Sequence, residues 1–451
     1  MFNKVLVANR GEIAVRIIRA CRELGIETVA IYSECDKDAL HTQLADEAIC
    51  VGPAKAAASY LNMTNVLSAA VLSGAQAIHP GFGFLSENAK FARMCTECGI
   101  KFIGPSPEAI EKMGDKAMAR ETMKNAGVPI VPGSDGPVHT MEKARSEAQR
   151  IGFPLLVKAA SGGGGRGMRI VRHEDELESL VNAAKMESKA AFGDDTVYME
   201  RFVENPKHIE FQIIADQFGH VVHLGERDCS MQRRNQKVIE EAPSPSLPME
   251  TRIKMGKVAI QAASAADYEN AGTVEFLLDQ SGEFFFIEMN TRIQVEHPVT
   301  EMITGIDLIK EQLRVAAGEK LKFTQEDVEI RGHSIECRIN AENPYENFRP
   351  CPGKIETLII PGGPGVRVDS AVYPGYSIPP VYDSMIGKLI VHGVDRDEAI
   401  RKMKRALGEF LITGIDTNID FHFDILSHQS YMDGDYHTKT LENEIIDQEG
   451  R

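Results

Sequence analysis

Short apolar runs alternate with longer amphipathic stretches near the start of the chain. Val5–Ala8 and Thr28–Tyr32 have the composition of buried strands, and Ile13–Leu24 between them has the spacing of a helix with one apolar face. Such alternation predicts a parallel sheet with helices on its faces, as in a Rossmann-like fold. The turn after the first strand reads Asn9-Arg-Gly-Glu, without the three glycines of a dinucleotide-binding turn. We therefore expect a Rossmann-like fold that does not bind NAD.

Glycine and proline signals divide the chain further. In Asn125-Ala-Gly-Val-Pro129, the glycine stands at the expected C-terminus of a helix and the proline just beyond it. The length of 451 residues predicts about three domains of mixed α/β and α+β class. We expect a Rossmann-like N-terminal domain at residues 1–114, a central region at 115–330 with a mobile lid at about 131–203, and a strand-rich C-terminal domain at 331–446. The proline-rich stretch Glu240–Pro248 is predicted to be a loop.

Polar side chains stand at every second position from residue 288 to residue 296, where the chain reads Glu-Met-Asn-Thr-Arg-Ile-Gln-Val-Glu. Because side chains alternate across a strand, all five would lie on one face of an extended strand. At about 3.3 Å per residue, however, a straight strand would place Glu296 ~26 Å beyond Glu288, too far for one compact site. We therefore expect the segment to bend or loop after about Asn290.

The residues just before this segment predict a β-hairpin. Two apolar runs flank Gln280-Ser-Gly282, and pairing Asp279 with Phe284 would place Glu275 opposite Glu288. Like charges directly opposite on a sheet are destabilising, so a cation between them is indicated. Oxygen ligands from Glu275, Glu288 and Asn290 favour magnesium or manganese, and magnesium commonly shares its shell with phosphate, which implies a nucleotide. The alternative, a solvated amphipathic strand, accounts poorly for the facing glutamates.

A glycine-rich loop, Ser161–Gly167, joins the apolar strand Phe153–Lys158 to a second strand, Met168–Val171. It is not a Walker loop, because no Gly-Lys-Ser/Thr opens a helix after it. Consecutive glycines let backbone N–H groups approach an anion closely, and a loop on a hairpin can close over bound phosphates. A flexible solvent-exposed turn is the alternative. Lys158 at the end of the incoming strand favours phosphate binding.

Further candidate residues carry charge or hydrogen-bonding groups. Lys116 follows Asp115, the expected N-cap of a helix, and a cation there opposes the helix dipole unless an anion is near. His208, Glu210 and Gln212 share one face of the strand Lys207–Ile214, and Gln232-Arg-Arg-Asn-Gln-Lys237 is a cationic cluster that could hold a small anion together with Arg292. Solvated faces are the alternative for each. Glu200–Val203 ends a strand and could offer backbone groups to a purine.

Composition limits the function classes. The chain has 50 basic and 66 acidic residues, a net charge of −16, which argues against a nucleic-acid surface and makes any cationic pocket a local feature. No apolar run has the length of a membrane span, and the N-terminus opens as a strand rather than a signal peptide, so we expect a cytoplasmic protein that does not bind membranes. The eight cysteines include one Cys-x-x-Cys pair, Cys95 and Cys98, on a predicted helix without a partner pair at zinc spacing. Reduced, packed thiols are expected.

In its motifs the chain resembles the ATP-grasp superfamily, and within it the biotin carboxylase subunits of acetyl-CoA carboxylase, over nearly its whole length. The resemblance rests on several long motifs in the same order: Asn9-Arg-Gly-Glu-Ile-Ala, His79-Pro-Gly-Phe-Gly-Phe-Leu-Ser-Glu-Asn88, Gly114-Asp-Lys, Lys158 with its glycine loop, Gln232-Arg-Arg-Asn-Gln-Lys237, residues 288–296, and Cys337-Arg-Ile-Asn-Ala-Glu342. It implies that residues 115–330 form an ATP-grasp region. It further implies that ATP phosphorylates bicarbonate to carboxyphosphate, whose breakdown supplies carbon dioxide to N1 of biotin on a carrier protein. This is the first half-reaction of acetyl-CoA carboxylase, which serves fatty acid synthesis.

The resemblance also implies roles for individual residues. ATP would be bound by Lys116, Lys158, Gly163, Gly164, Gly165, Glu200, Arg201, Phe202, Val203, His208, Gln232, Asn235, Glu275, Leu277 and Glu288. Mg²⁺ or Mn²⁺ would be held by Glu275, Glu288 and Asn290, and bicarbonate by Lys237, Arg292, Gln294 and the Val295 N–H. Glu296 would be the general base, and Arg338 would stabilise the biotin enolate; Glu296, Arg292, Arg338 and Lys237 form the expected catalytic set.

Two positions depart from the family pattern. Asn235 stands where relatives often have histidine, and Phe82 where they often have tyrosine, so the contacts to ATP or biotin at these positions differ from the pattern. The chain lacks the Ala-Met-Lys-Met biotinylation motif, so the biotin carboxyl carrier protein and the carboxyltransferase subunits are expected to be separate chains. A homodimer is expected by resemblance. Two rival functions are an ATP-grasp ligase that joins a carboxylate to an amine, and a non-catalytic regulator that binds nucleotide.

Overall fold

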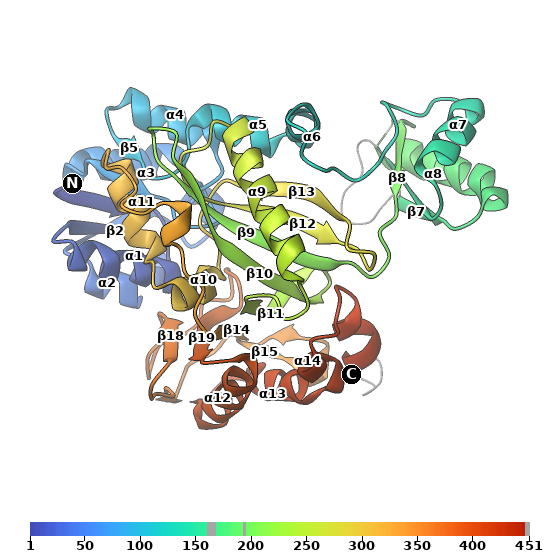
Figure 1. Ribbon diagram of the computed structural model, residues 1–451. Helices are drawn as coiled ribbons and strands as arrows, with labels where there is room; N and C mark the ends of the chain where they lie inside the picture. The colour runs from blue at the N-terminus through green and yellow to red at the C-terminus, as the bar shows by residue number, and fades with distance from the viewer. Residues whose placement is uncertain (160–167, 193–194, 447–451) are drawn as a thin grey trace. The chain divides into compact units, whose positions relative to one another are not determined.

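The computed structural model describes residues 1–159, 168–192 and 195–446. These residues form two compact units (Figure 1). The first comprises Met1–Val128, Lys207–Phe276 and Glu288–Arg451, and the second comprises Pro129–Pro206 and Leu277–Ile287. The domain limits predicted from the sequence, including the lid at about 131–203, remain predictions.

The first unit begins with a five-stranded parallel sheet of strand order β3-β2-β1-β4-β5. Its strands are β1 Lys4–Val7, β2 Glu27–Ser33, β3 Glu47–Gly52, β4 Ala77–His79 and β5 Lys101–Phe102. The accompanying helices are α1 Gly11–Glu23, α2 Leu40–Leu44, α3 Met63–Ser73, α4 Ala89–Glu97, α5 Pro107–Gly114 and α6 Lys116–Asn125. Val5, Leu6 and Val7 are fully buried, as expected for a strand covered on both faces. The predicted Rossmann-like domain is confirmed.

The turn after β1 is held by side-chain contacts rather than by glycines. The Asn9 side-chain amide donates to the carbonyls of Pro80 and Phe82, both at 2.7 Å. Gly11, with φ of 66°, adopts the left-handed conformation that glycine tolerates best and opens α1. Two of the sequence motifs, residues 9–14 and 79–88, are therefore neighbours in space.

An eight-stranded sheet forms the centre of the first unit, with strand order β13-β12-β9-β10-β11-β14-β19-β18. The strands are β9 Lys207–Ala215, β10 Val221–Arg233, β11 Gln236–Ala242, β12 Asn270–Leu278, β13 Phe284–Asn290, β14 His333–Asn340, β18 Val366–Ser370 and β19 Met385–Gly393. Helix α9, Met249–Ala265, packs across β9 and β10 (Figure 1). The sheet thus joins strands from the predicted central region and from the predicted C-terminal domain.

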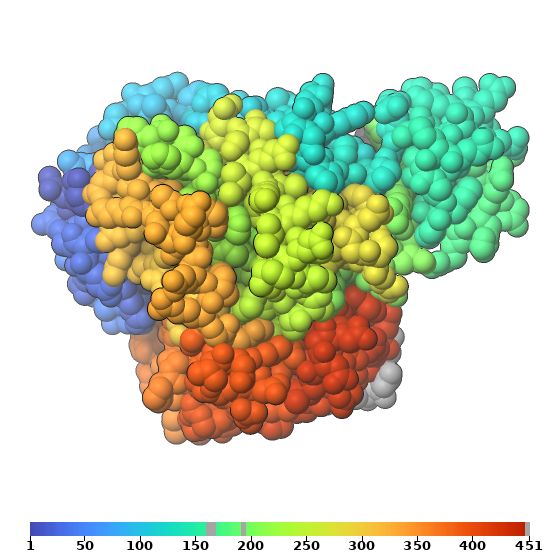
Figure 2. Space-filling model, viewed as in Figure 1, coloured from blue at the N-terminus to red at the C-terminus, as the bar shows by residue number. Residues whose placement is uncertain are grey.

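The remaining elements of the first unit pack around this sheet. They are helices α10 His297–Thr304, α11 Leu308–Ala316, α12 Arg396–Glu409, α13 Ile419–Ser427 and α14 Gln429–Asp433, and the short strands β15 Glu342–Asn343, β16 Arg349–Pro350, β17 Thr357–Ile359 and β20 Leu411–Thr413. Figure 2 shows the C-terminal segment, coloured orange to red, as one continuous mass. Ile335, Leu389, Met403 and Phe421, all fully buried, belong to one hydrophobic core, which also includes Met231 and Ile239.

The second unit has its own small core. Strands β6 Leu155–Ala159, β7 Met168–Val171 and β8 Val197–Arg201 form an antiparallel sheet of order β7-β6-β8, with α7 Met141–Ile151 and α8 Leu177–Phe192 packed against it (Figure 1). Lys158 pairs with Met168, as the hairpin around the glycine loop requires. The two predicted strands are confirmed, whereas Gly163, Gly164 and Gly165 lie outside the described residues.

Three local expectations need correction. The five alternating polar residues do not share one strand face: β13 ends at Asn290, and the chain then bends until α10 starts at His297. The expected bend after Asn290 is therefore confirmed. The stretch Glu240–Pro248 is not wholly a loop, because β11 extends to Ala242 and the Glu240–Ala242 backbone pairs with β14. At the hairpin turn the Asp279 amide donates to the carbonyl of Glu283 at 2.8 Å, rather than to Phe284.

Candidate active site

Charged side chains gather on one face of the eight-stranded sheet, next to the segment that connects β13 to α10. Adjacent strands contribute one or two each: Glu275 from β12, His208 and Glu210 from β9, Arg227 from β10, Lys237 and Glu240 from β11, and Arg338 from β14. Helix α10 packs on the same strands through Val299 and Ile303, beside Ala242 and Ile390. This packing places Glu296, the residue before α10, over the charged face.

Lys237 is the centre of this cluster. Its Nζ lies 2.6 Å from Glu210 Oε2, 2.6 Å from Glu296 Oε1 and 3.2 Å from Glu275 Oε1. Although burial opposes it, the charges of Glu210, Glu275 and Glu296 raise the pKa of Lys237 well above its ordinary value. Lys237 therefore stays a cation at neutral pH.

Arg227 lies beneath the cluster and is wholly buried. Its guanidinium donates to Glu210 Oε1 at 2.7 Å and to Gln294 Oε1 at 2.6 Å. Further donations reach Gln212, Thr300 and Thr273 at 2.8, 2.9 and 3.2 Å. Each of its three nitrogen atoms therefore has a partner, as a buried guanidinium requires. Because Arg227 holds Glu210 and Gln294 together, it fixes the geometry of the strand face relative to the connecting segment.

Glu296 lies between two cations. One carboxylate oxygen contacts Lys237 at 2.6 Å, and the other contacts Arg338 at 3.1 Å. Arg338 is in turn held by Glu240, whose Oε1 accepts from the Arg338 Nε at 2.6 Å. Burial raises the pKa of Glu296, but Lys237 and Arg338 outweigh it, so that the pKa of this carboxyl lies below its ordinary value. A buried carboxylate that is ionised at neutral pH can accept a proton.

Glu240 differs from Glu296 although both contact Arg338. Burial, together with the nearby charge of Glu296, raises the pKa of Glu240 to about 6, against the lowering effect of Arg338. The site therefore contains two carboxyls with separated pKa values. Such a pair is characteristic of sites that hold and move protons.

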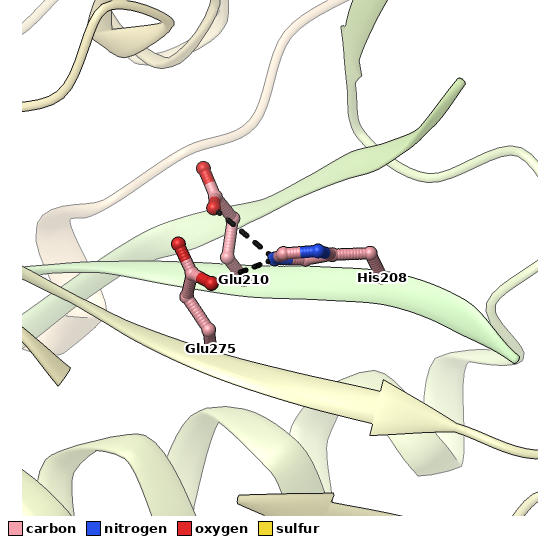
Figure 3. A group of neighbouring side chains, drawn as sticks. All are labelled: His208, Glu210 and Glu275. Atoms are coloured by element: carbon pink, nitrogen blue, oxygen red, sulfur yellow. Dashed lines mark ion pairs between the residues drawn. The ribbon is translucent and has the colours of Figure 1, made fainter. Parts of the chain in front are cut away.

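His208, Glu210 and Glu275 form a second group at the edge of the cluster (Figure 3). His208 Nε2 lies 2.9 Å from Glu275 Oε2 and 3.7 Å from Glu210 Oε2. Burial lowers the pKa of His208, but the charge of Glu275 outweighs it and the pKa is raised overall. Their ligand atoms are close enough to hold a metal ion. Lys237, however, contacts both glutamates, so a cation bound there would face an ammonium group.

The oxygen donors Glu275, Glu288 and Asn290 form a second candidate set for a divalent cation, in which Lys237 contacts Glu275 alone. Burial, followed by the negative charge of Glu275, raises the pKa of Glu288, so a positive charge beside it would be favourable. Asn290 adjoins this position, because its amide nitrogen donates to Glu275 Oε1 at 2.7 Å. Two carboxylates and an amide carbonyl are ligands that Mg²⁺ accepts. The chemistry of the donor set therefore fits a magnesium site.

The segment from Thr291 to Glu296 supplies the remaining polar groups. Arg292 donates to Glu87 Oε2 at 2.8 Å and to Asn290 Oδ1 at 3.0 Å. Gln294 donates to Glu275 Oε1 at 2.8 Å, and the Val295 carbonyl accepts from Lys388 at 2.6 Å. Gln294 and Glu296 thus join the charged cluster, whereas Arg292 lies against Asn290 and Glu87.

The predicted nucleotide-binding residues of the first unit have distinct settings. Lys116 is exposed at the start of α6, whose N-cap Asp115 accepts from the amides of Ala117 and Met118. The positive charge of Lys116 lowers the pKa of Glu288, against the larger effects of burial and Glu275. Gln232 is buried and contacts His208 Nδ1 at 2.9 Å. Asn235 is exposed in the turn between β10 and β11, with φ of 63°. Lys116 and Gln232 thus adjoin the charged face.

The predicted nucleotide-binding residues of the second unit lie on β6 and β8 and beyond. Lys158 contacts Glu200 at 2.5 Å. Arg201 contacts Asp279 at 3.1 Å, and its amide donates to Pro132. The Phe202 amide donates to Pro154, and Val203 and Leu277 are buried and half-buried, respectively. The amides of Arg201 and Phe202 are thus engaged within the second unit.

Sequence reasoning assigned no role to several residues that contact the cluster or the segment from Thr291 to Glu296. They are Glu87, Arg227, Glu240 and Lys388, while Glu210 was noted only as a polar strand residue. Glu210 could have been found from its alternation with His208. Lys388 carries no local signal, because a lone cation within an apolar strand resembles any other exposed residue until its neighbours are known. Arg227 stands between Glu226 and Asp228, so its sequence context is that of an ordinary surface ion pair.

Comparison with known protein families shows matches along most of the chain. Residues 1–110 match the family described as the biotin carboxylase N-terminal domain, residues 115–324 the ATP-binding domain of the carbamoyl-phosphate synthase L chain, and residues 336–443 the biotin carboxylase C-terminal domain. None of the helices in the described part of the chain combines the length and apolar character needed to cross a membrane.

Individual relatives are similar over nearly their whole length. Biotin carboxylase 1 of Bacillus subtilis is 60% identical over 443 residues, 98% of each chain. A pyruvate carboxylase subunit of Methanothermobacter thermautotrophicus is 57% identical over 97% of this chain and 89% of that protein. Among solved structures, the biotin carboxylase domain of a thermophilic 2-oxoglutarate carboxylase bound to bicarbonate covers 99% of both chains, with 51% identity and a TM-score of 0.95. The biotin carboxylase domain dimer of the Hydrogenobacter thermophilus 2-oxoglutarate carboxylase, in complex with MgADP, ADP and bicarbonate, is 52% identical with a TM-score of 0.89. The match covers 99% of this chain and 98% of that chain.

Proposed function

This chain belongs to the biotin carboxylase family, and from that premise we propose that it carboxylates biotin with bicarbonate at the expense of ATP. The observation that carries the proposal is the position of Glu296 between Lys237 and Arg338, at 2.6 and 3.1 Å. One carboxylate here contacts two cations, each of which can hold an anionic reactant, so a base and its anion-binding groups are already together. The bicarbonate-bound relative supports the choice of substrate.

The candidates for binding ATP fall into two groups. Lys116, His208 and Gln232 are those of the first unit, and Lys158 with residues 200–203 and Leu277 those of the second. Mg²⁺ held by Glu275, Glu288 and Asn290 would neutralise negative charge on the phosphates of the nucleotide. The structure of a relative with MgADP supports this assignment.

The first chemical step would be attack of a bicarbonate oxygen on the γ-phosphorus of ATP, with loss of ADP and formation of carboxyphosphate. Lys237, Arg292, Gln294 and the Val295 N–H would hold bicarbonate, and Glu296 would take its proton. The lowered pKa of Glu296 keeps the carboxylate ready to accept that proton at neutral pH. Lys237 remains charged and can balance the anion as the proton leaves.

The second step would transfer carbon dioxide to biotin. Carboxyphosphate breaks down to carbon dioxide and phosphate, the phosphate can take the N1 proton of biotin, and N1 then forms a bond to the carbon of carbon dioxide. Arg338 would stabilise the negative charge on the ureido oxygen of biotin. Its side chain is mostly buried and held by Glu240, so the cation is positioned before biotin arrives.

The wider assembly is part of the proposal. We infer a biotin carboxyl carrier protein as acceptor and separate carboxyltransferase subunits, and a homodimer, which the dimer of the Hydrogenobacter relative supports. We favour acetyl-CoA carboxylase, and hence fatty acid synthesis, as the whole complex; the similarity to a pyruvate carboxylase subunit makes pyruvate carboxylase the alternative. All eight cysteines are free thiols, which supports a cytoplasmic location.

Incorporation of carbon-14 bicarbonate into free biotin, with and without ATP, tests the proposal. We expect label in biotin that is lost on acidification, and that can be trapped as the methyl ester of N1-carboxybiotin, only when ATP and Mg²⁺ are present. ATP hydrolysis should depend on bicarbonate and increase with biotin. A ligase that joins a carboxylate to an amine would hydrolyse ATP without this dependence on bicarbonate, and a nucleotide-binding regulator would show neither activity; either result would overturn the proposal.

A further inference from the structure

A wholly buried lysine lies behind the proposed bicarbonate-binding segment. Lys388 is on β19, the strand next to β14, and its side chain has no exposure to solvent. Its Nζ donates to the backbone carbonyl of Val295 at 2.6 Å. The proposed mechanism above assigns Lys388 no role.

The carboxylates around Lys388 do not account for its position. Glu12 Oε1 on α1 forms an ion pair with Lys388 at 3.3 Å, a longer contact than that with the Val295 carbonyl. The charges of Glu336, Asp369 and Arg367 also affect the pKa of Lys388. Asp369 pairs with Arg367 at 2.7 Å. Neither carboxyl oxygen of Glu336 has a hydrogen-bond donor in the described structure. The shortest polar contact of the ammonium group is therefore with a neutral carbonyl. Burying an ammonium group is costly, and the ion pair with Glu12 offsets that cost; the shorter contact with the Val295 carbonyl therefore indicates a positional requirement in addition to charge pairing.

The Val295 carbonyl belongs to the peptide bond that leads into Glu296. Holding this oxygen sets the orientation of the Val295–Glu296 peptide plane, because the plane is rigid. Glu296 follows directly, at the start of α10, and its carboxylate contacts Lys237 and Arg338. One lysine thus restrains the peptide plane that leads into the proposed base. Through the Cα of Val295 it also limits the adjoining Gln294–Val295 plane, which carries the proposed bicarbonate donor, the Val295 N–H.

We propose that Lys388 is a positioning residue for bicarbonate, which acts by holding the Val295 carbonyl and thereby aligning the Val295 N–H and the Glu296 carboxylate. The inference rests on the proposed function. Lys388 does not touch the reactants. Loss of its contact should therefore weaken the use of bicarbonate and leave nucleotide binding intact, whereas a purely structural ion pair with Glu12 would affect both alike.

The test uses the full chain with Glu12 changed as well, because removing Lys388 alone would leave a buried carboxylate without a cation. Three variants are compared with wild type: K388M/E12Q, which loses the carbonyl contact; E12Q, which keeps it; and K402M, a matched control. Lys402 likewise donates to a backbone carbonyl, that of His392 at 2.5 Å, away from the charged cluster. Bicarbonate-dependent ATP hydrolysis gives KM for bicarbonate, KM for ATP and kcat, and thermal melting reports folding.

We expect the KM for bicarbonate of K388M/E12Q to rise about tenfold or more, with kcat lowered and the KM for ATP within about twofold of wild type. E12Q and K402M should stay within about twofold for all three parameters. A folded double variant with an unchanged KM for bicarbonate, or with both KM values raised in parallel, would overturn the inference.

Two further outcomes separate the alternatives. If K388M/E12Q does not fold, K388M/E12L is measured in its place, because this apolar pair leaves no buried polar group at either position. Failure of both variants to fold would mean that Lys388 serves the fold, and would also overturn the inference. If the wild-type protein shows no bicarbonate-dependent ATP hydrolysis, the proposed function fails rather than this inference.

Discussion

At the residue scale, the behaviour of each carboxyl depends on which cations face it. Glu296 contacts Lys237 and Arg338 and has a lowered pKa, whereas Glu240 contacts Arg338 alone and has a pKa of about 6. Both are fully or almost fully buried. The difference therefore comes from the neighbouring charges rather than from burial.

Replacing Glu296 by glutamine should abolish turnover while retaining ATP binding. The glutamine amide keeps the shape of the side chain but cannot accept the bicarbonate proton, so we expect kcat to fall by about 10²–10⁴-fold. The Kd for ATP, measured by titration calorimetry, should change less than about twofold. E250Q, on the exposed start of α9, is the control and should match wild type. Full activity of E296Q would exclude a role for Glu296 as the base.

Arg227 should dominate the stability of the site. Replacing it by methionine removes one of the two cations that contact Glu210 and leaves the buried side-chain carbonyl oxygens of Gln212 and Gln294 without their donor. We expect a loss of about 3–5 kcal/mol in the free energy of unfolding, measured with urea. R331M removes an arginine of which 78% of the side chain is exposed and should cost less than about 1 kcal/mol. A similar cost for both variants would contradict this account.

At the element scale, the ends of strands and helices place the reactive groups. Strand β13 stops at Asn290, and α10 starts at His297, so the intervening segment can turn Gln294 and Glu296 toward the sheet. A continuous strand would have carried Glu296 out of reach of Lys237. Helix α6 shows the same principle, because its N-cap, Asp115, sets the position of Lys116.

Replacing Asp115 by alanine should weaken ATP binding as well as the helix. The Asp115 carboxylate accepts from the amides of Ala117 and Met118, both at 2.9 Å, so its loss should cost about 1 kcal/mol and loosen the first turn of α6. We expect the KM for ATP to rise several-fold. S106A removes the equivalent N-cap of the neighbouring helix α5 and should cost similar stability without changing the KM for ATP. An equal rise in both variants would show that Lys116 is not the cause.

At the scale of the whole molecule, burial of neutral histidines makes stability depend on pH. His41 and His422 are fully buried, and burial lowers the pKa of each to about 4. A histidine whose pKa is lower in the folded state contributes stability above its unfolded pKa of about 6.5, and this contribution is lost as the pH falls toward 4. Glu240 acts in the opposite direction, because its pKa is raised.

A comparison of wild type with H422Q isolates one of these histidines. Between pH 7 and pH 5 the wild-type protein should lose about 2 kcal/mol more than H422Q in its free energy of unfolding, because only the wild type has this group to protonate. Urea unfolding at the two pH values measures the difference. The same loss in both proteins would mean that His422 does not have the lowered pKa.

Much of the fold followed from local pattern. The buried strand at Val5–Val7, the N-cap at Asp115, the pair of strands around the glycine loop and the bend after Asn290 are short-range features, and hydrophobic periodicity, capping and strand geometry predicted each of them. The strand character of Glu240 was missed because three prolines in the following residues suggested a loop throughout. Residues 243–248 do leave the strand, so the error concerned the boundary of the element.

The sequence by itself determined the residue types of the site and their order: carboxylates, amides and an arginine alternating from 288 to 296, cations at 237 and 338, and the motifs of the biotin carboxylase family. Only the tertiary structure decided which charges meet. Lys237 contacts residues 27, 38 and 59 positions away, and Lys388 reaches Val295 across 93 positions, because sheet order places β12, β9, β10, β11, β14 and β19 side by side. Pairing between distant strands depends on long-range packing, and no local pattern of side chains specifies it.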